Sequence, residues 1–163
     1  MKHVKPGHSQ PVVCLDAGHS GDSNRSPAVP QYYESDMSWT LHLLLKAALE
    51  RYGIVVKTTR ETKNATLDVY ERGAASKGCD LFLSFHTNTR SENWLMKESN
   101  LTRLAEEEAA VIAEYFDVPE PVVERDKLYR IQAGAFREKA NAEAYLAEIK
   151  AAGLDAYITT QAD

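Results

Sequence analysis

Three side chains in this sequence are of the types that hold a catalytic metal ion: His19, Glu34 and His86. His19 stands in a sharp turn after the apolar run 12–15, and His86 ends a second apolar run that starts at residue 80. Glu34 follows a polar loop, at the point where a helical pattern begins. Two imidazoles and one carboxylate are a ligand set for a catalytic zinc that keeps one coordination position open for water.

The elements around these residues predict how they are positioned. The pattern predicts strands at residues 12–16, 54–59 and 79–86, with a helix between the first two strands and a short one before the third. A strand–helix–strand order favours parallel pairing with a right-handed crossover. We therefore expect an α/β fold, with a small, mostly parallel sheet of about three strands flanked by helices. Its carboxyl edge, where open α/β folds place ligands, would carry His19 and His86.

The helices carry more detailed expectations. Ser35 is predicted to cap a helix that ends at Gly53, and Thr66 is predicted to cap a short helix that Gly78 closes. A longer helix is expected from residue 100 to residue 116. Surface positions are predicted for His42, for Arg25 in the loop 20–33, for the acidic run Glu106, Glu107 and Glu108, and for His3 and His8 in the lead-in. A structural role is predicted for Arg72, and the run 81–83 is expected to be buried on both faces of the sheet.

Composition excludes several functions. The chain has 163 residues, of which 44% are hydrophobic and 26% charged, and this indicates one globular domain or one domain with an appendage. A net charge of −5 argues against nucleic acid as a partner. No apolar run is long enough to insert into a membrane. Cys14 and Cys79 are too isolated to form a disulfide framework and are expected to be buried free thiols.

Three motifs resemble those of a known family. LDAGHSG around His19, YYES around Glu34 and DLFLSFHTN ending beyond His86 are similar to the zinc-dependent N-acetylmuramoyl-L-alanine amidases of the Amidase_3 type, from about residue 12 to residue 116. The resemblance implies that His19, Glu34 and His86 bind Zn²⁺. It also implies cleavage of the amide between N-acetylmuramic acid and the L-alanine of the peptidoglycan stem peptide.

One residue that the resemblance implies is missing. The family carries a general-base glutamate on a late strand, and Phe82 stands at the aligned position. We expect an internal deletion near residues 86–93 that removed this strand. Glu71, Glu92 and Glu98 are possible substitutes, although each is expected at the surface. An inactive or impaired remnant that still binds peptidoglycan is therefore the alternative, and another zinc hydrolase, such as a carboxypeptidase, is a third reading.

The C-terminal part resembles a different module. Residues 117–127 contain two prolines and four acidic residues and are predicted to be a linker. Residues 128–163 resemble the first half of a SPOR repeat, which implies a β-α-β fragment with its helix at about residues 139–152. Its opening signature is matched by Tyr129, Gln132, Gly134 and Phe136, and the resemblance implies that Tyr129, Gln132 and Phe136 bind glycan strands.

Residues 1–11 are predicted to be a flexible lead-in to a catalytic domain at 12–116. No apolar signal segment is visible in it. Action at the bacterial cell wall or outside the cell would then need phage-type release, as for an endolysin, or a leader that this sequence lacks. The oligomeric state stays open.

Overall fold

The computed structural model describes residues 2–87, 91–121 and 132–160. The chain divides into two compact units, Met1–Val122 and Val123–Asp163, which are described separately. No helix in the described ranges is long and apolar enough to cross a membrane.

The first unit is built on a three-stranded parallel sheet. Strands β1 (Val12–Ala17), β2 (Val55–Thr58) and β3 (Leu81–Phe85) lie in the order β2-β1-β3. Both neighbours pair in parallel with β1, so the three carboxyl ends meet at one edge of the sheet. The predicted α/β fold with a small parallel sheet is confirmed.

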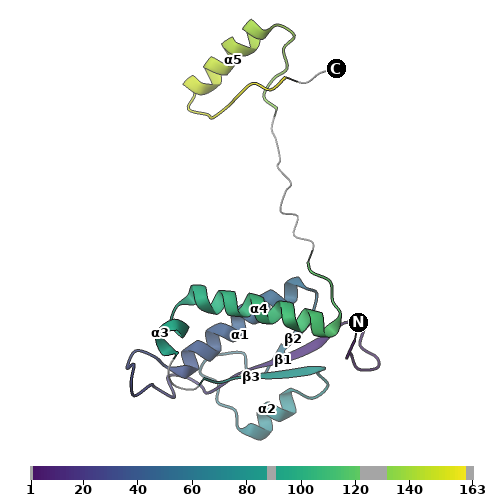
Figure 1. Cartoon of the computed structure of the whole chain (residues 1–163), viewed down its shortest axis with the longest axis vertical. Helices are drawn as coiled ribbons and strands as arrows, with labels where there is room; N and C mark the ends of the chain where they lie inside the picture. The colour runs from purple at the N-terminus through teal and green to yellow at the C-terminus, as the bar shows by residue number, and fades with distance from the viewer. Residues whose placement is uncertain (1, 88–90, 122–131, 161–163) are drawn as a thin grey trace. The chain divides into compact units, whose positions relative to one another are not determined.

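Helices cover the two faces of this sheet unequally. Figure 1 shows α1 (Glu34–Arg51) and α4 (Glu98–Phe116) on one face and the short α2 (Val69–Ala75) on the other, while α3 (Glu92–Leu95) precedes α4. The core lies between β1, α1 and α4, and each of its large apolar side chains contributes about 1.5–3 kcal/mol. Its members include Val13, Leu15, Leu41, Leu45, Leu49, Ala105, Ala109, Ile112 and Phe116.

His42 is buried, so its predicted surface position is wrong. Its Nδ1 lies 2.6 Å from the carbonyl oxygen of Trp39 on the same helix. Burial lowers the pKa of His42 below its usual value. The periodicity revealed one apolar face of α1, but this helix is covered by the sheet and by α4, so a second face is buried as well.

The two predicted helix caps are also wrong. Helix α1 begins after Tyr33, and Ser35 lies buried inside its first turn, where its Oγ accepts a hydrogen bond from the backbone of Ser23. Helix α2 is capped by Asp68, whose side chain forms a reciprocal capping box with Glu71. Gly53 follows the C-cap residue of α1 with a positive φ of 74°, as expected. Helix α2 ends at Ala75, and Gly78, with a φ of 82°, lies two residues beyond its C-cap residue Ser76.

Strand β3 is not buried on both faces as the apolar run 81–83 predicted. Phe82 points to the face that α2 covers only in part, and it is 40% exposed. Leu81 and Leu83 are half-buried on the face toward α1 and α4. The reason is that β3 is an edge strand with β1 on one side and, among the described residues, no strand on the other.

The lead-in is tied to the first unit by its histidines. Nδ1 of His8 lies 3.0 Å from Oδ2 of Asp80, and the His3 ring stacks on Tyr115 with a centroid distance of 4.3 Å. His3 is exposed, as predicted, and His8 is partly exposed, but the sequence did not reveal their contacts. Both partners lie more than 70 residues away in the sequence, so no local pattern points to them.

Both cysteines are buried and free, as predicted. Burial, with Cys79 nearby, raises the pKa of Cys14 to about 12. A thiol with such a pKa stays protonated at neutral pH and is a poor nucleophile.

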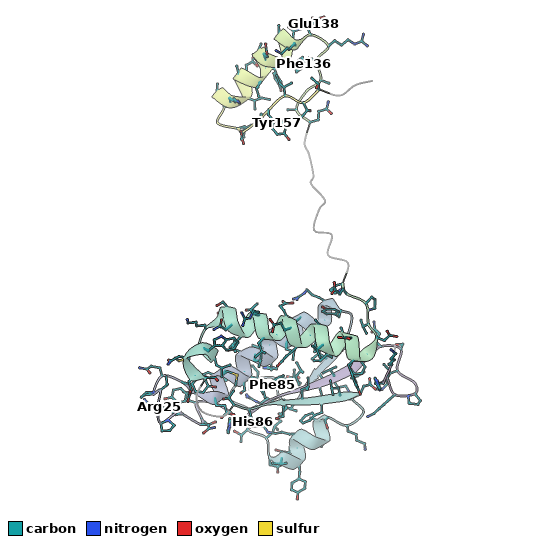
Figure 2. The ribbon with its side chains drawn as sticks, in the orientation of Figure 1. Arg25, Phe85, His86, Phe136, Glu138 and Tyr157 are labelled. Carbon is teal, nitrogen blue, oxygen red and sulfur yellow. The ribbon has the colours of Figure 1, made fainter. Side chains whose placement is uncertain are left out.

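The second unit is described around one helix, α5 (Lys139–Ala151), which confirms the predicted helix. No strand is assigned within the described residues 132–138 and 154–160, so the flanking strands of the predicted β-α-β fragment are not seen there. Two strands alone form a marginal sheet, which accounts for this difference. Phe136 and Tyr157 lie in the segments that flank α5 (Figure 2).

Candidate metal site

The turn after β1 and the start of α1 bring His19 and Glu34 together. His19 adopts a positive φ of 60°, an uncommon conformation for a residue with a side chain. Nε2 of His19 lies 3.4 Å from Oε1 of Glu34. Arg72 supports this turn, since Nη2 of its guanidinium donates to the carbonyl oxygen of His19 at 3.3 Å. The structural role predicted for Arg72 is confirmed by this contact.

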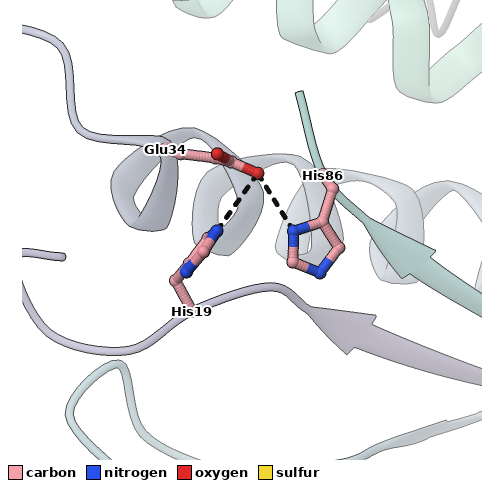
Figure 3. Close-up of side chains that lie close together, drawn as sticks. All are labelled: His19, Glu34 and His86. Atoms are coloured by element: carbon pink, nitrogen blue, oxygen red, sulfur yellow. Dashed lines mark hydrogen bonds and ion pairs between the residues drawn. The ribbon is translucent and has the colours of Figure 1, made fainter. Parts of the chain in front are cut away.

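His86 completes the cluster from the end of β3 (Figure 3). Its Nδ1 lies 3.0 Å from the same oxygen of Glu34, and its ring meets the His19 ring edge-on at a centroid distance of 4.9 Å. Figure 2 shows His86 next to Phe85 at the end of β3. The Glu34 side chain is 5% exposed, whereas that of His86 is 55% exposed, so the cluster is anchored on a buried carboxylate and open to solvent at the histidine.

Gly18 allows the two turns to approach each other. A Cβ at this position would lie 2.3 Å from the carbonyl oxygen of Phe85 and within 2.8 Å of two ring atoms of His86. The backbone of Gly18 donates to that carbonyl at 3.2 Å, so the ladder between β1 and β3 continues to the site. A side chain here would push the strand ends apart.

Two further groups hold the Glu34 carboxylate and were not found by sequence reasoning. Asn24 Nδ2 donates to Oε2 of Glu34 and lies 3.2 Å from Nε2 of His19. The backbone N–H of Thr87 donates to Oε1 at 2.8 Å. A signal for Asn24 existed, because asparagine in a loop readily takes the positive φ seen here, 56°. Nothing in the sequence indicates the Thr87 contact.

The cluster fits a zinc ion. The ligand atoms of His19, Glu34 and His86 all lie within 4.8 Å of one another, and no other such group of three or more His, Cys, Asp or Glu occurs in the described residues. Ligands around a tetrahedral zinc at about 2.0–2.1 Å are separated by roughly 3.3–3.5 Å. The distances of 3.0 and 3.4 Å from Glu34 Oε1 to the two histidines are close to this separation.

Beneath the site, a buried carboxylate connects all three strands. Asp16 accepts hydrogen bonds from Thr59, Ser84 and Arg72, each at 2.6 Å. Burial alone would raise the pKa of Asp16, but these three hydrogen bonds outweigh it and hold the pKa below its usual value. Asp16 is therefore an ionised support for the turn that carries His19.

The substitute glutamates are not members of the cluster. Glu71 is engaged in the cap of α2, and Glu98 is exposed at the start of α4. Glu92 is buried, contrary to its predicted surface position, and accepts a hydrogen bond from Ser26 Oγ at 3.0 Å. This hydrogen bond connects the loop 20–33 to α3. Phe82, at the position aligned with the general base, carries no ionisable group.

Arg25 is not a member of this cluster, and the residues expected to bind glycan belong to the second unit. Arg25 is exposed, as expected, and donates to the carbonyl oxygen of Pro30 within its own loop at 2.6 Å. Gln132 is exposed, and Phe136 is 46% exposed with its ring 5.5 Å from that of Tyr145. Tyr129 lies outside the described residues.

Comparisons with known protein families agree with the two-part reading of the chain. The profile described as N-acetylmuramoyl-L-alanine amidase (Amidase_3) matches residues 13–96, which is more than half of the chain, and the SPOR domain profile matches residues 125–163. Neither the comparison with curated proteins nor that with solved structures found a match. The two profiles indicate peptidoglycan as the binding partner. By its match to the family profile, the chain belongs to the Amidase_3 family of N-acetylmuramoyl-L-alanine amidases, and it carries a C-terminal SPOR region.

Proposed function

We propose that this protein is a zinc-dependent peptidoglycan amidase that cleaves the bond between N-acetylmuramic acid and the L-alanine of the stem peptide. The observation that carries the proposal is the convergence of His19, Glu34 and His86 from three separate elements onto one carboxylate oxygen. Family membership supplies the reaction class. Because the proposed substrate is peptidoglycan, the protein would act at the bacterial cell wall.

His19, Glu34 and His86 would hold the zinc. When bound, zinc supplies positive charge that polarises the scissile carbonyl and lowers the pKa of water. Asn24 and Thr87 orient the Glu34 carboxylate, a role that outer groups commonly play around metal ligands. The exposure of His86 leaves the site open to a polymeric substrate.

The C-terminal region would hold the protein on the wall. In this proposal residues 12–116 form the catalytic domain, 117–127 the linker and 128–163 the SPOR region, with Tyr129, Gln132 and Phe136 contacting glycan. The exposure of Gln132 and Phe136 supports this role, because a binding residue has to be accessible.

A second function, wall binding with little or no catalysis, is favoured by one specific observation. Glu34 is the sole carboxylate in the cluster among the described residues, and it would be a zinc ligand. A missing general base typically costs about 10²- to 10⁴-fold in rate. An internal deletion near residues 86–93 would explain this loss together with the short sheet.

The two functions are separated by chemical analysis of purified peptidoglycan after incubation with the zinc-loaded full chain. Amidase action releases stem peptides with a new L-alanine amino terminus and leaves free lactyl carboxyl groups on the glycan. Their appearance, and its loss in His86→Ala, supports the amidase. Sedimentation of the protein with the wall without these products supports the binding function instead.

A further inference from the structure

The outer side of strand β3 borders a groove. Because β3 pairs with β1 on one side alone, the other side of this edge strand presents backbone groups that no described strand satisfies. In most sheets such an edge is covered by another element, or it carries charged residues, prolines or bulges that prevent pairing with a further strand. Here it faces a cavity of about 570 Å³ between β3 and α4.

The groove is lined mostly by apolar side chains and reaches His86 of the candidate metal site. Its walls include Leu83 and Phe85 from β3, Met37 from α1, and Leu104 and Ile112 from α4. At one end it is bordered by His86 and Thr87. A ligand whose reacting bond lies at the histidine cluster can therefore continue into the groove.

The side chain of Glu108 lies in the wall of this groove and lacks a hydrogen-bond partner for one of its oxygens among the described residues. Its Oε2 is buried and has no hydrogen-bond partner among the described residues, which contradicts the predicted solvated position of this glutamate. Glu107 lines the same groove, and no lysine or arginine is among the described residues that line it. Burial raises the pKa of Glu108 above its usual value. A buried carboxylate without a partner costs stability, so a cationic ligand would relieve this cost.

We propose that this groove binds the stem peptide as an added strand along β3, with Glu108 accepting the primary ammonium of a diamino-acid side chain. This inference rests on the proposed function, which brings the peptide to His86. Main-chain pairing with a sheet edge is a common way to bind an extended peptide. The five residues of β3 span about 16 Å, enough for a short peptide of four or five residues. The carboxylates of Glu107 and Glu108, with no lysine or arginine among the described lining residues, favour a cationic side chain over a neutral or acidic one.

Binding of two tetrapeptides to the zinc-free full chain, measured by titration calorimetry, tests this inference without relying on catalysis. The probes are the stem tetrapeptide with lysine as its third residue and the same peptide with norleucine there. A charge-assisted hydrogen bond predicts that the lysine peptide binds about 10-fold or more tightly. Glu108→Gln should abolish this preference. The matched control is Glu114→Gln, which removes the same charge from an exposed position of α4 and should keep the preference.

Each contrary outcome has a distinct meaning. Equal affinities of the two peptides for the wild-type protein would overturn the role of Glu108, and no binding of either peptide would overturn the groove. A concentration-dependent dimer that excludes the peptide would assign β3 to a second copy of the chain and also overturn the inference. A lysine preference without wall cleavage by the zinc-loaded protein would refute the proposed function alone.

Discussion

Arg72 Nη1 lies 2.6 Å from Oδ1 of Asp16, and this ion pair joins helix α2 to the strand that leads into His19. The same guanidinium nitrogen donates to the carbonyl oxygen of Ala17 at 2.9 Å. The Asp16 side chain is almost fully buried, and that of Arg72 is mostly buried. The turn that carries His19 in the candidate metal site is thus supported by a buried charged network.

Removing the charge of Asp16 should destabilise the first unit strongly. Breaking a buried pair by changing one partner leaves the other charge uncompensated, so Asp16→Asn is expected to lower the free energy of unfolding by about 3 kcal/mol. Urea unfolding followed by circular dichroism measures this. Lys46→Met, which breaks an exposed pair with Glu50, is the control and should cost less than about 0.5 kcal/mol. Similar costs for the two variants would contradict the buried network.

Glu108 should make stability depend on pH in a defined direction. Because burial raises its pKa above 4.5, folding favours the protonated acid. Its contribution is fully present below pH 4.5 and is lost as the pH rises through the higher pKa of the folded state. Glu108→Gln is therefore expected to raise the free energy of unfolding at pH 7 by about 1 kcal/mol and to change it little below pH 4. Parallel stability curves for variant and wild type would argue against a buried acid.

Alanine substitutions at Gly18 and Gly73 can be compared directly, because an added Cβ is crowded at Gly18 and unobstructed at Gly73. Gly18→Ala places a methyl group against the backbone of Phe85 and the ring of His86, so it should separate the strand ends and weaken zinc binding at least 10-fold. Gly73 lies within α2 with nothing within 4 Å of an added Cβ, so Gly73→Ala should raise stability by about 0.5–1 kcal/mol and leave zinc binding intact. Zinc titration of both variants checks this, and unchanged affinity in Gly18→Ala would show that the close approach is not needed.

Phe82 and Phe85 should respond differently to truncation, although they lie on the same strand. Phe85 is buried in the core, so Phe85→Ala is expected to cost about 3–5 kcal/mol. Phe82 is partly exposed, so Phe82→Thr should cost less than about 1 kcal/mol and reduce aggregation of the edge strand. Unfolding and light-scattering measurements test both, and a large cost at Phe82 would mean that its face of the sheet is covered.

The sequence predicted the meeting of His19, Glu34 and His86 better than it predicted the positions of the residues around them. Residues at the ends of parallel strands meet at one edge by geometry, which is why His19 and His86 could be placed near each other without coordinates. The positions of His42 and Glu108 were predicted wrongly because helical periodicity identifies one buried face of a helix. It does not show whether a second element packs against another face. The exposure of Phe82 depends on the number of strands in the sheet, and an apolar run of three residues does not encode that number.

The capping errors have a similar cause. Ser35 and Thr66 have suitable side chains, but Tyr33 and Asp68 occupy the cap positions because tertiary contacts fix where each helix begins. Ser35 is instead used to hold the loop through Ser23. The contact of Asn24 with Glu34 was not predicted, because it depends on the conformation of a loop that has no periodic sequence pattern.

The central claim, that His19, Glu34 and His86 hold zinc, is tested most directly by metal content. Purified full-length protein would be stripped with a chelator, reloaded with zinc and measured by mass spectrometry, with circular dichroism confirming the fold. We predict one zinc per chain, its loss in His19→Ala and His86→Ala, and its retention in His8→Ala, which alters a histidine bound to Asp80. A folded wild-type protein without zinc, or full zinc content in His86→Ala, would contradict the account.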